Sequence, residues 1–220
     1  MSTAVLKNTV TPAPSPFRPQ NDVILLGGVT WDQYRAYRDD PENDGVRMHY
    51  ADGELLLMTT GILHERISHL LALMLAVWSQ FSGTRIMGFG RWTMQEELKK
   101  KGLEADNCYY VRHVSYVQQK ETLDLAVDPP PDLAIEIDIT THSQLKFDIY
   151  AELGVPEVWV CEGDRLVAHR LGGGTYEQVS ESRELPGFPI DVASRFILEH
   201  LRDDDATLLD AFRAELDGMA

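Results

Sequence analysis

The chain has 220 residues and a formal net charge of −15 at pH 7, and 44 % of its residues are hydrophobic. This length suits one sizeable domain with tails. The negative charge argues against non-specific binding of nucleic acid through a broad basic face, but it allows a local basic groove or metal ions that offset the carboxylates. The sequence contains no run of eighteen apolar residues, so we expect no membrane span.

Both ends of the chain differ in composition from its middle. The N-terminal stretch is rich in Pro, Ser and Thr and lacks the long apolar segment of a secretory signal. We therefore expect a disordered tail at 1–25, a single domain over 26–200 and an acidic helical tail at 201–220. Cys108 and Cys161 are far apart and lack metal-type spacing, which favours reduced thiols in a cytoplasmic protein.

Hydrophobic periodicity and turn residues delimit the predicted elements along the chain. Helices are predicted over 30–38 with Thr30 as N-cap, 64–81, 143–153 and most of 191–216. Strands are predicted over 46–58 as a hairpin turning at "DG", 85–94, 105–112, 132–139, 157–163, 166–171 and 175–179. This order suggests an α+β fold with a mixed sheet that contains one parallel β–α–β unit over 132–161.

The stretch "PDLAIEIDIT" at 131–140 alternates strictly, which predicts a strand with one apolar and one acidic face. At a rise of ~3.3 Å per residue, Asp132 and Glu136 lie too far apart to share an ion unless the strand bulges. Glu136 and Asp138 are close enough to share one site. A further ligand for Glu136 must come from another strand. A solvated acidic face is the alternative, but a central strand rarely carries acids without a partner.

Asp106, at the start of a predicted strand in "LEADNCYYV", is the local candidate for that further ligand. Two carboxylates on adjacent strands suit a hard divalent ion such as Mg²⁺, and a water bound to the ion is acidified. Lys146 begins the helix after the acidic strand, and its stem can swing back so that the ammonium orients water or stabilises charge on a phosphate. A surface lysine is the alternative. Because Lys146 lies at the edge of its helix's apolar stripe, we expect it to act in catalysis and not in folding.

Basic and aromatic side chains give weaker signals. Trp78, Trp92 and Trp159 are interpreted as core residues more readily than as platforms for stacking bases. A solvated hairpin loop is the favoured interpretation of "KKK". The candidates for a basic rim are Arg85, Arg91, Lys99, Lys100 and Lys101.

Taken together, "EADNCYYV", "PPPDLAIEIDI", the lysine at 146 and "YAELGVPEVWV" resemble the Uma-type family of putative restriction endonucleases, in the PD-(D/E)XK nuclease superfamily. "DGELLLM" followed by "HERISHLLALML" fits the front half of that family, so the resemblance covers about residues 30–190. "YAELGVPEVW" is its most specific match. The resemblance implies a restriction-endonuclease-like fold, in which helices flank a central mixed sheet.

The resemblance also implies roles for individual residues. Asp106 would be the first metal-binding acid, Glu136 the second, and Lys146 a lysine that has moved from the strand to the following helix. Glu54, in the early hairpin, matches a further acid that would complete the metal shell. His64 matches a histidine at a helix start, where it would contact phosphate or assist proton transfer. A helix cap or half-buried histidine is the alternative for His64.

Two departures from the superfamily pattern stand out. The "PD" pair is "AD" here, with Ala105 before Asp106, so the acid is kept and the stiffening proline is lost. The "ExK" triplet ends in Asp138 where the lysine would be. Asp138 is therefore either a third metal ligand or a bystander, and the role of the lysine depends on Lys146.

The favoured function is that of an endonuclease that hydrolyses DNA phosphodiester bonds with Mg²⁺ or Mn²⁺ and a metal-activated water. A catalytically inactive module that keeps the nuclease fold for binding or regulation is the alternative, favoured by the net charge and the missing strand lysine. A third hypothesis is an oligomer assembled through the acidic tail at 203–220. Whether the substrate is DNA or RNA, and whether the protein is a homodimer, stay open.

Overall fold

The computed structural model describes residues 5–6, 22–137, 143–163 and 165–219. The helices are α1 Trp31–Arg38, α2 Ile62–Ser82, α3 Val114–Val117, α4 Ser143–Leu153, α5 Ile190–Glu199 and α6 Asp205–Met219, with a 3-10 turn η1 at Pro41–Asn43. The strands are β1 Val5–Leu6, β2 Val23–Gly27, β3 Arg47–Ala51, β4 Glu54–Met58, β5 Met87–Glu96, β6 Lys101–Tyr110, β7 Leu133–Ile137, β8 Glu157–Glu162, β9 Arg165–Gly172 and β10 Thr175–Val179.

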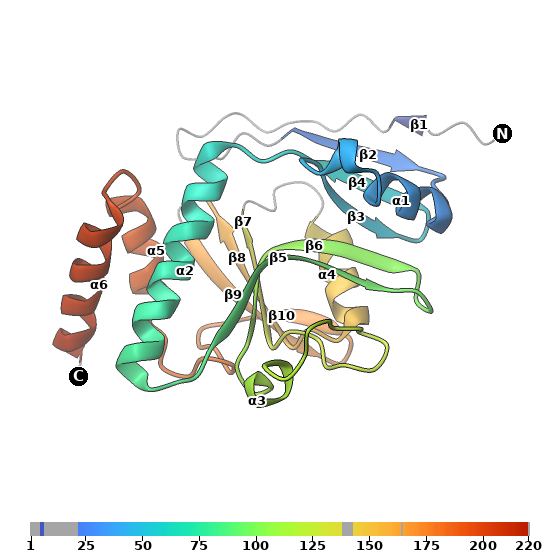
Figure 1. The fold of residues 1–220 in the computed structure, drawn as a ribbon. Coiled ribbons are helices and arrows are strands. Elements are labelled where there is room, and N and C mark those ends of the chain that lie inside the picture. Colours follow the sequence, from blue (N-terminus) through green and yellow to red (C-terminus); the bar gives the residue numbers. More distant parts are fainter. Residues whose placement is uncertain (1–4, 7–21, 138–142, 164, 220) are drawn as a thin grey trace.

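The strands form one mixed sheet of ten strands in the order β1-β2-β4-β3-β6-β7-β8-β9-β10, with β5 paired to β6 (Figure 1). β7 is a central strand, parallel to β8 and antiparallel to β6. Helix α4 connects β7 to β8, so the predicted parallel β–α–β unit is confirmed. The α+β class with a mixed sheet and flanking helices is confirmed as well.

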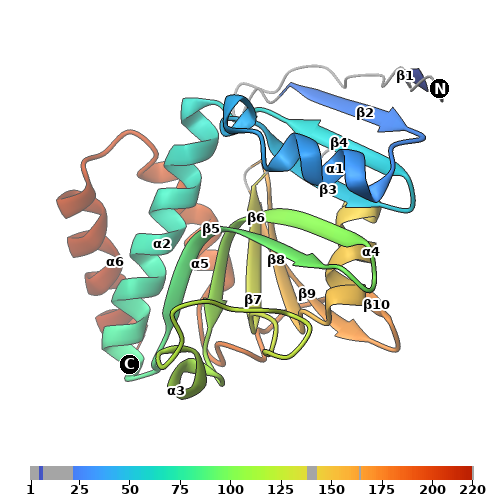
Figure 2. The same ribbon diagram turned by 45° about the vertical axis from the view of Figure 1, so that its right-hand side comes forward.

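Helices cover both faces of the central strands, as Figure 2 shows: α2, α5 and α6 lie on one side and α4 on the other. Leu133, Ile135 and Ile137 of β7 join the hydrophobic core under α2, α5 and α6. Ala134, which points the opposite way, packs with Ile149 of α4. Each large apolar side chain buried in these layers contributes roughly 1.5–3 kcal/mol, so the two layers hold β7 firmly in place.

Local sequence signals account for several element boundaries. Thr30 caps α1 in a capping box with Gln33, as expected of a threonine before a helix. Asp52 and Gly53 both have positive φ, 50° and 84°, which is the backbone that a tight "DG" hairpin turn requires. Gly83 ends α2 in the left-handed conformation with φ 74°.

The structure differs from the predicted elements at both ends. Val23–Gly27 is a strand paired antiparallel to β4, although residues up to 25 were expected to belong to a disordered tail. The predicted helix over 191–216 is two helices, because the side chain of Asp204 accepts the backbone N–H of Thr207 and begins α6 there. No helix in the described part of the chain is both long and apolar enough to cross a membrane.

Asp132 and Glu136, the acids of the 131–140 stretch that the structure describes, are buried and not solvated. Asp132 lies just before β7, and its Oδ2 accepts the backbone N–H groups of Val111, Arg112 and His113. Asp132 therefore holds the turn after β6. Glu136 is also buried, on the α4 side of the sheet.

Candidate active site

The candidate site forms where β3 and β7 meet end to end along one edge of β6. β3 pairs with β6 at Gly102, and the β7 pairing begins at Asn107. Asp106 lies between these two pairings. The first residue of β3, Arg47, and the last residue of β7, Ile137, both contact its carboxylate. The topology of the sheet thus brings three strands to one carboxylate.

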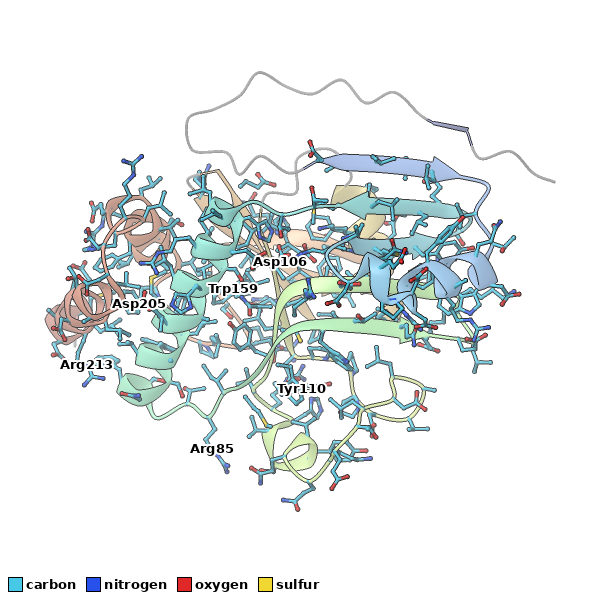
Figure 3. The ribbon with its side chains drawn as sticks, turned by 45° about the horizontal axis from the view of Figure 1, so that its top comes forward. Arg85, Asp106, Tyr110, Trp159, Asp205 and Arg213 are labelled. Carbon is cyan, nitrogen blue, oxygen red and sulfur yellow. The ribbon has the colours of Figure 1, made fainter. Side chains whose placement is uncertain are left out.

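Asp106 is buried and held by three donors. Its Oδ2 accepts the backbone N–H of Ile137 at 2.6 Å and lies 3.0 Å from Nε2 of His64, near the start of α2. Its Oδ1 forms an ion pair with the guanidinium of Arg47. Arg47 also reaches Glu65 at 3.0 Å, so it links the carboxylate to the first turn of α2. Figure 3 shows Asp106 near the end of α2 where the helix begins.

Glu136 is fully buried and held by two side chains of α4. Lys146 Nζ donates to its Oε2 at 2.7 Å, and the Tyr150 hydroxyl donates to its Oε1. Lys146 and Tyr150 are one helical turn apart, so both point from the same face of α4 to the sheet. The predicted swing of Lys146 back to the acidic strand is therefore present in the structure.

Asp106 and Glu136 lie on neighbouring strands at the point where the strands part. Continuing the register from the pair Asn107–Ile135 would place Asp106 opposite Glu136. At that position the Asp106 carboxylate accepts a hydrogen bond from the backbone N–H of Ile137, the residue after Glu136. The Asp106 side chain thus reaches the end of β7 next to Glu136, whereas the Glu136 carboxylate turns to Lys146 and Tyr150 of α4.

The electrostatic environment keeps His64 neutral at pH 7. Burial, followed by the charge of Arg47, lowers its pKa to about 4. A neutral imidazole beside a carboxylate carries its proton on the nitrogen that faces the oxygen, so Nε2–H donates to Asp106. His64 therefore orients the carboxylate.

His49 is a second buried histidine of this region and has no hydrogen-bond partner on either ring nitrogen among the described residues. It lies on the same face of β3 as Arg47, since the two are two residues apart. Burial lowers the pKa of His49 well below its usual range, and the charges of Lys146 and Arg47 lower it further. His49 thus lies near the cations of both carboxylates, and its ring has no hydrogen-bond partner in the described part of the chain.

A polar cleft of about 370 Å³ opens over Asp106, between α2 and strands β5 and β6. Asp106 lies at this cleft, whereas Glu136 and Lys146 do not line it. The lining residues are Arg47, Glu65, Ser68, His69, Ala72, Arg91, Asp106 and Asn107.

Not every candidate lies at the junction. Glu54 pairs with Ala51 at the turn of the β3–β4 hairpin, whereas Arg47, which contacts Asp106, pairs with Met58 four residues further along β4. The register therefore places Glu54 at the far end of the hairpin, and the group that the structure brings together does not include it. Asp138 lies outside the described residues.

The candidate basic rim is mostly engaged elsewhere. Lys101 is buried and pairs with Asp52 and Glu152, so it is not part of a solvated loop. Arg85 donates to Gln118. Of the rim candidates, Arg91 is the one that lines the cleft.

Known proteins resemble this chain in sequence and in fold. The family model Uma2, described as "Putative restriction endonuclease", matches residues 31–193, which is most of the chain. The chain belongs to the Uma2 family. The resemblance inferred from the sequence motifs is therefore confirmed. Among curated proteins, none matches this chain.

A solved structure shares the fold of this Uma2 protein. It is the crystal structure of a putative nuclease belonging to DUF820 from Anabaena variabilis, with a TM-score of 0.50 and 15 % sequence identity. The match covers 84 % of this chain and 99 % of that chain. At this identity the likeness concerns the fold alone.

Carboxylate oxygens such as those of Asp106 and Glu136 in this Uma2 protein are the type of ligand that a hard divalent ion prefers. Mg²⁺ is commonly bound by one or two carboxylates and keeps several waters. Within the described residues, no group of three or more His, Cys, Asp or Glu side chains is arranged to hold a metal ion. Lys146 and Arg47 now supply the positive charge that an ion would bring to Glu136 and Asp106. An ion at either carboxylate would therefore replace one of these contacts.

Sequence reasoning missed Arg47, Tyr150 and His49. Arg47 and His49 are on a strand whose alternation places them on one face, which was an available signal. Tyr150 lies four residues after Lys146 and so shares its helix face. What the sequence did not reveal is that β3 and β7 meet at Asp106.

Proposed function

We propose that this protein is an endonuclease that hydrolyses phosphodiester bonds of DNA with the help of Mg²⁺ or Mn²⁺. The observation that supports the proposal is that Asp106 and Glu136, at the end of the pairing between neighbouring strands, each have a cation against the carboxylate. Buried, charge-paired acids at a cleft are candidates for a functional site, and Asp106 lines such a cleft. Family membership supports the nuclease assignment. DNA as the substrate and Mg²⁺ or Mn²⁺ as the metal are part of the proposal.

Each residue of the junction has a role in this proposal. Asp106 and Glu136 would hold the ion, which when bound would supply an acidified water for attack on phosphorus. Lys146 orients the water or neutralises charge that develops on the phosphate. His64 fixes the Asp106 carboxylate through Nε2. Arg47 is a fixed cation at the cleft and stabilises the anionic phosphate.

A cleavage assay tests the proposal. Supercoiled plasmid and labelled oligonucleotides are incubated with the full chain in Mg²⁺ or Mn²⁺. Glu136→Gln and Asp106→Asn keep the side-chain shape and remove the charge, so each should lower the cleavage rate at least 10²-fold. Glu162→Gln, at the exposed end of β8, makes the same change away from the site and should cleave as the parent does. Circular dichroism verifies that each variant is folded.

Binding of the ion is tested without relying on activity. A ligand that binds only the folded state raises the melting temperature, so millimolar Mn²⁺ should raise it for the parent. The shift should disappear in Glu136→Gln.

A second candidate function is a binding or regulatory module that has kept the nuclease fold. The enclosure of Glu136, which is 0 % exposed and engaged at both oxygens, is the observation that favours it. The two candidates differ in outcome. A module should show neither a metal-induced melting shift nor cleavage with any divalent ion, and that combination would replace the nuclease proposal.

A further inference from the structure

A β-bulge in β6 lies directly across from Arg91 and contains the candidate metal-binding acid Asp106. The register of β5 and β6 shifts there, so that the single residue Arg91 lies opposite both Asp106 and Asn107. The pairs on either side of the bulge are Gly90 with Cys108 and Trp92 with Ala105. A bulge bends its strand and re-aims a side chain, and bulges are enriched next to active sites.

Arg91 faces the cleft over Asp106. Both residues line the same cavity of about 370 Å³, which is at the small end of the ~300–1,000 Å³ typical of ligand pockets. Gly90, just before Arg91, has φ +61°, a conformation that a residue with a side chain rarely adopts. A glycine at this position therefore accommodates the irregular backbone of β5 next to Arg91.

Arg91 differs from the other cations of the region because its charge is not committed. The Arg47 guanidinium contacts Asp106 and Glu65. Arg91 is exposed, and it makes no hydrogen bond or ion pair with any residue that the structure describes. Its charge acts on Glu104 only at longer range. A guanidinium with all its donors available is suited to the oxygens of a phosphate.

We propose that Arg91 binds a backbone phosphate of the nucleic acid and so positions the strand over Asp106. This inference rests on the proposed function and adds the residue and the mode of recognition. Of the other polar groups of the cleft, the Ser68 hydroxyl can donate to phosphate, whereas Asn107 Nδ2 donates to Ser68 and His69 Nε2 lies 2.8 Å from Asp205. No Phe, Tyr or Trp is among the described residues that line the cleft. Contacts of this kind fix position and register without selecting a base sequence. Binding through Arg91 is therefore independent of sequence.

The charge of the whole chain makes this single cation important. With a net charge of −15, the protein offers no general attraction to a polyanion. An uncommitted arginine at the cleft supplies local attraction where the acids would otherwise repel the strand. Loss of this one charge is thus expected to have a measurable effect on binding.

Binding measurements on full-length Arg91→Gln test the proposal. Fluorescent single-stranded and duplex oligonucleotides of two unrelated sequences are titrated in Ca²⁺ buffer at several NaCl concentrations, with gels to verify that they stay intact. We expect affinity to fall about tenfold for both sequences. The slope of log K against log salt should become less steep by about 0.7 for single strands or 0.9 for duplex, as expected for one lost phosphate contact. If the salt slope changes for only one of the two forms, single-stranded or duplex, that form is the one that Arg91 contacts.

Two variants make the result specific. Arg85→Gln removes the same charge from the segment before β5, where Arg85 donates to Gln118 and points away from Asp106 (Figure 3), and it should bind as the parent does. Arg91→Lys keeps the positive charge and loses the planar guanidinium with its paired donors. This variant should therefore show the parent's salt slope but bind the oligonucleotide with lower affinity.

Three results would overturn the proposal. One is parental affinity and salt slope in Arg91→Gln, which would leave the proposed nuclease function intact. Another is an equal loss in Arg85→Gln, which would indicate general electrostatics only. The third is a parent that binds no oligonucleotide in either form, which would remove the proposed function together with this inference.

Discussion

Lys146 donates its Nζ to Oε2 of Glu136 at 2.7 Å, and only 3 % of the lysine side chain and none of the glutamate side chain is exposed. The position of Lys146 at the edge of an apolar stripe predicted that its ammonium could reach the acidic strand, and it does. The same position suggested a lysine that is dispensable for folding. The burial of the ion pair leads us to predict the opposite, because removal of one partner leaves the other charge buried and uncompensated.

Lys146→Met should therefore lower the free energy of unfolding by about 3–5 kcal/mol, since Glu136 loses its cation in a buried environment. Urea denaturation followed by circular dichroism measures the change. The double variant Lys146→Met/Glu136→Gln should recover a large part of the loss, because the stranded charge is then absent. If the single and double variants are equally stable, the pair is not a stabilising element of the fold. Activity must be compared at a temperature where each variant is folded.

Acidification should destabilise the protein through His64. Its pKa is lowered to about 4 in the folded state, against about 6.5 in the unfolded chain, so the unfolded state binds more protons between these values. The stability contribution is thus present above pH 6.5 and lost as the pH falls toward 4, by on the order of 3 kcal/mol. Unfolding measured from pH 7.5 to 4.5 should show a smaller loss in His64→Gln. A parent with flat stability over this range would contradict the neutral form of His64.

His49→Leu should raise stability, because two buried nitrogens without partners among the described residues are replaced by an apolar group. An unsatisfied buried polar group costs roughly 1–3 kcal/mol, which sets the size of the expected gain. His113→Leu is a matched contrast, since His113 Nδ1 lies 2.7 Å from Asp132 and its loss should destabilise. A gain in stability together with a loss of cleavage would mark His49 as a functional residue kept at a cost. Destabilisation by His49→Leu would mean that the imidazole has a partner.

Gly90→Ala should destabilise the protein by about 1–2 kcal/mol, the cost of a side chain in the left-handed region. A Cβ at this position would meet nothing within 4 Å, so the cost comes from the backbone and not from a clash. Gly90→Asn should cost less, because asparagine tolerates this conformation better. Thermal unfolding compares the two variants. Equal stability of parent and Gly90→Ala would show that β5 relaxes at this position without strain.

Most elements could be predicted from the sequence because each carries its own local signal. The turn at Asp52 and Gly53, the cap at Thr30 and the alternation of β7 depend on neighbouring residues alone. The strand at Val23–Gly27 was missed because its signal is its pairing with β4, which is distant in sequence.

Part of the candidate site could be predicted as well, because it depends on residues that are close in sequence. Lys146 is close to Glu136 in sequence, and a short connection made their contact foreseeable. The contact between Arg47 and Asp106 depends on two strands that end against the same edge of β6, and no local pattern encodes that meeting. The burial of Glu136 and the contacts of both its carboxylate oxygens with α4 likewise depend on tertiary packing.

The enclosure of Glu136 by α4 has a kinetic consequence. Its carboxylate is reached only after Lys146 or Tyr150 gives way, whereas the cleft with Arg91 is open to solvent. Association at Glu136 should therefore be limited by a conformational step, with an observed rate that levels off as ligand concentration rises. Association of a phosphate at the open cleft has no such step and should stay linear in concentration. The two halves of the site would then fill in sequence, with the nucleic acid arriving before Glu136 becomes accessible.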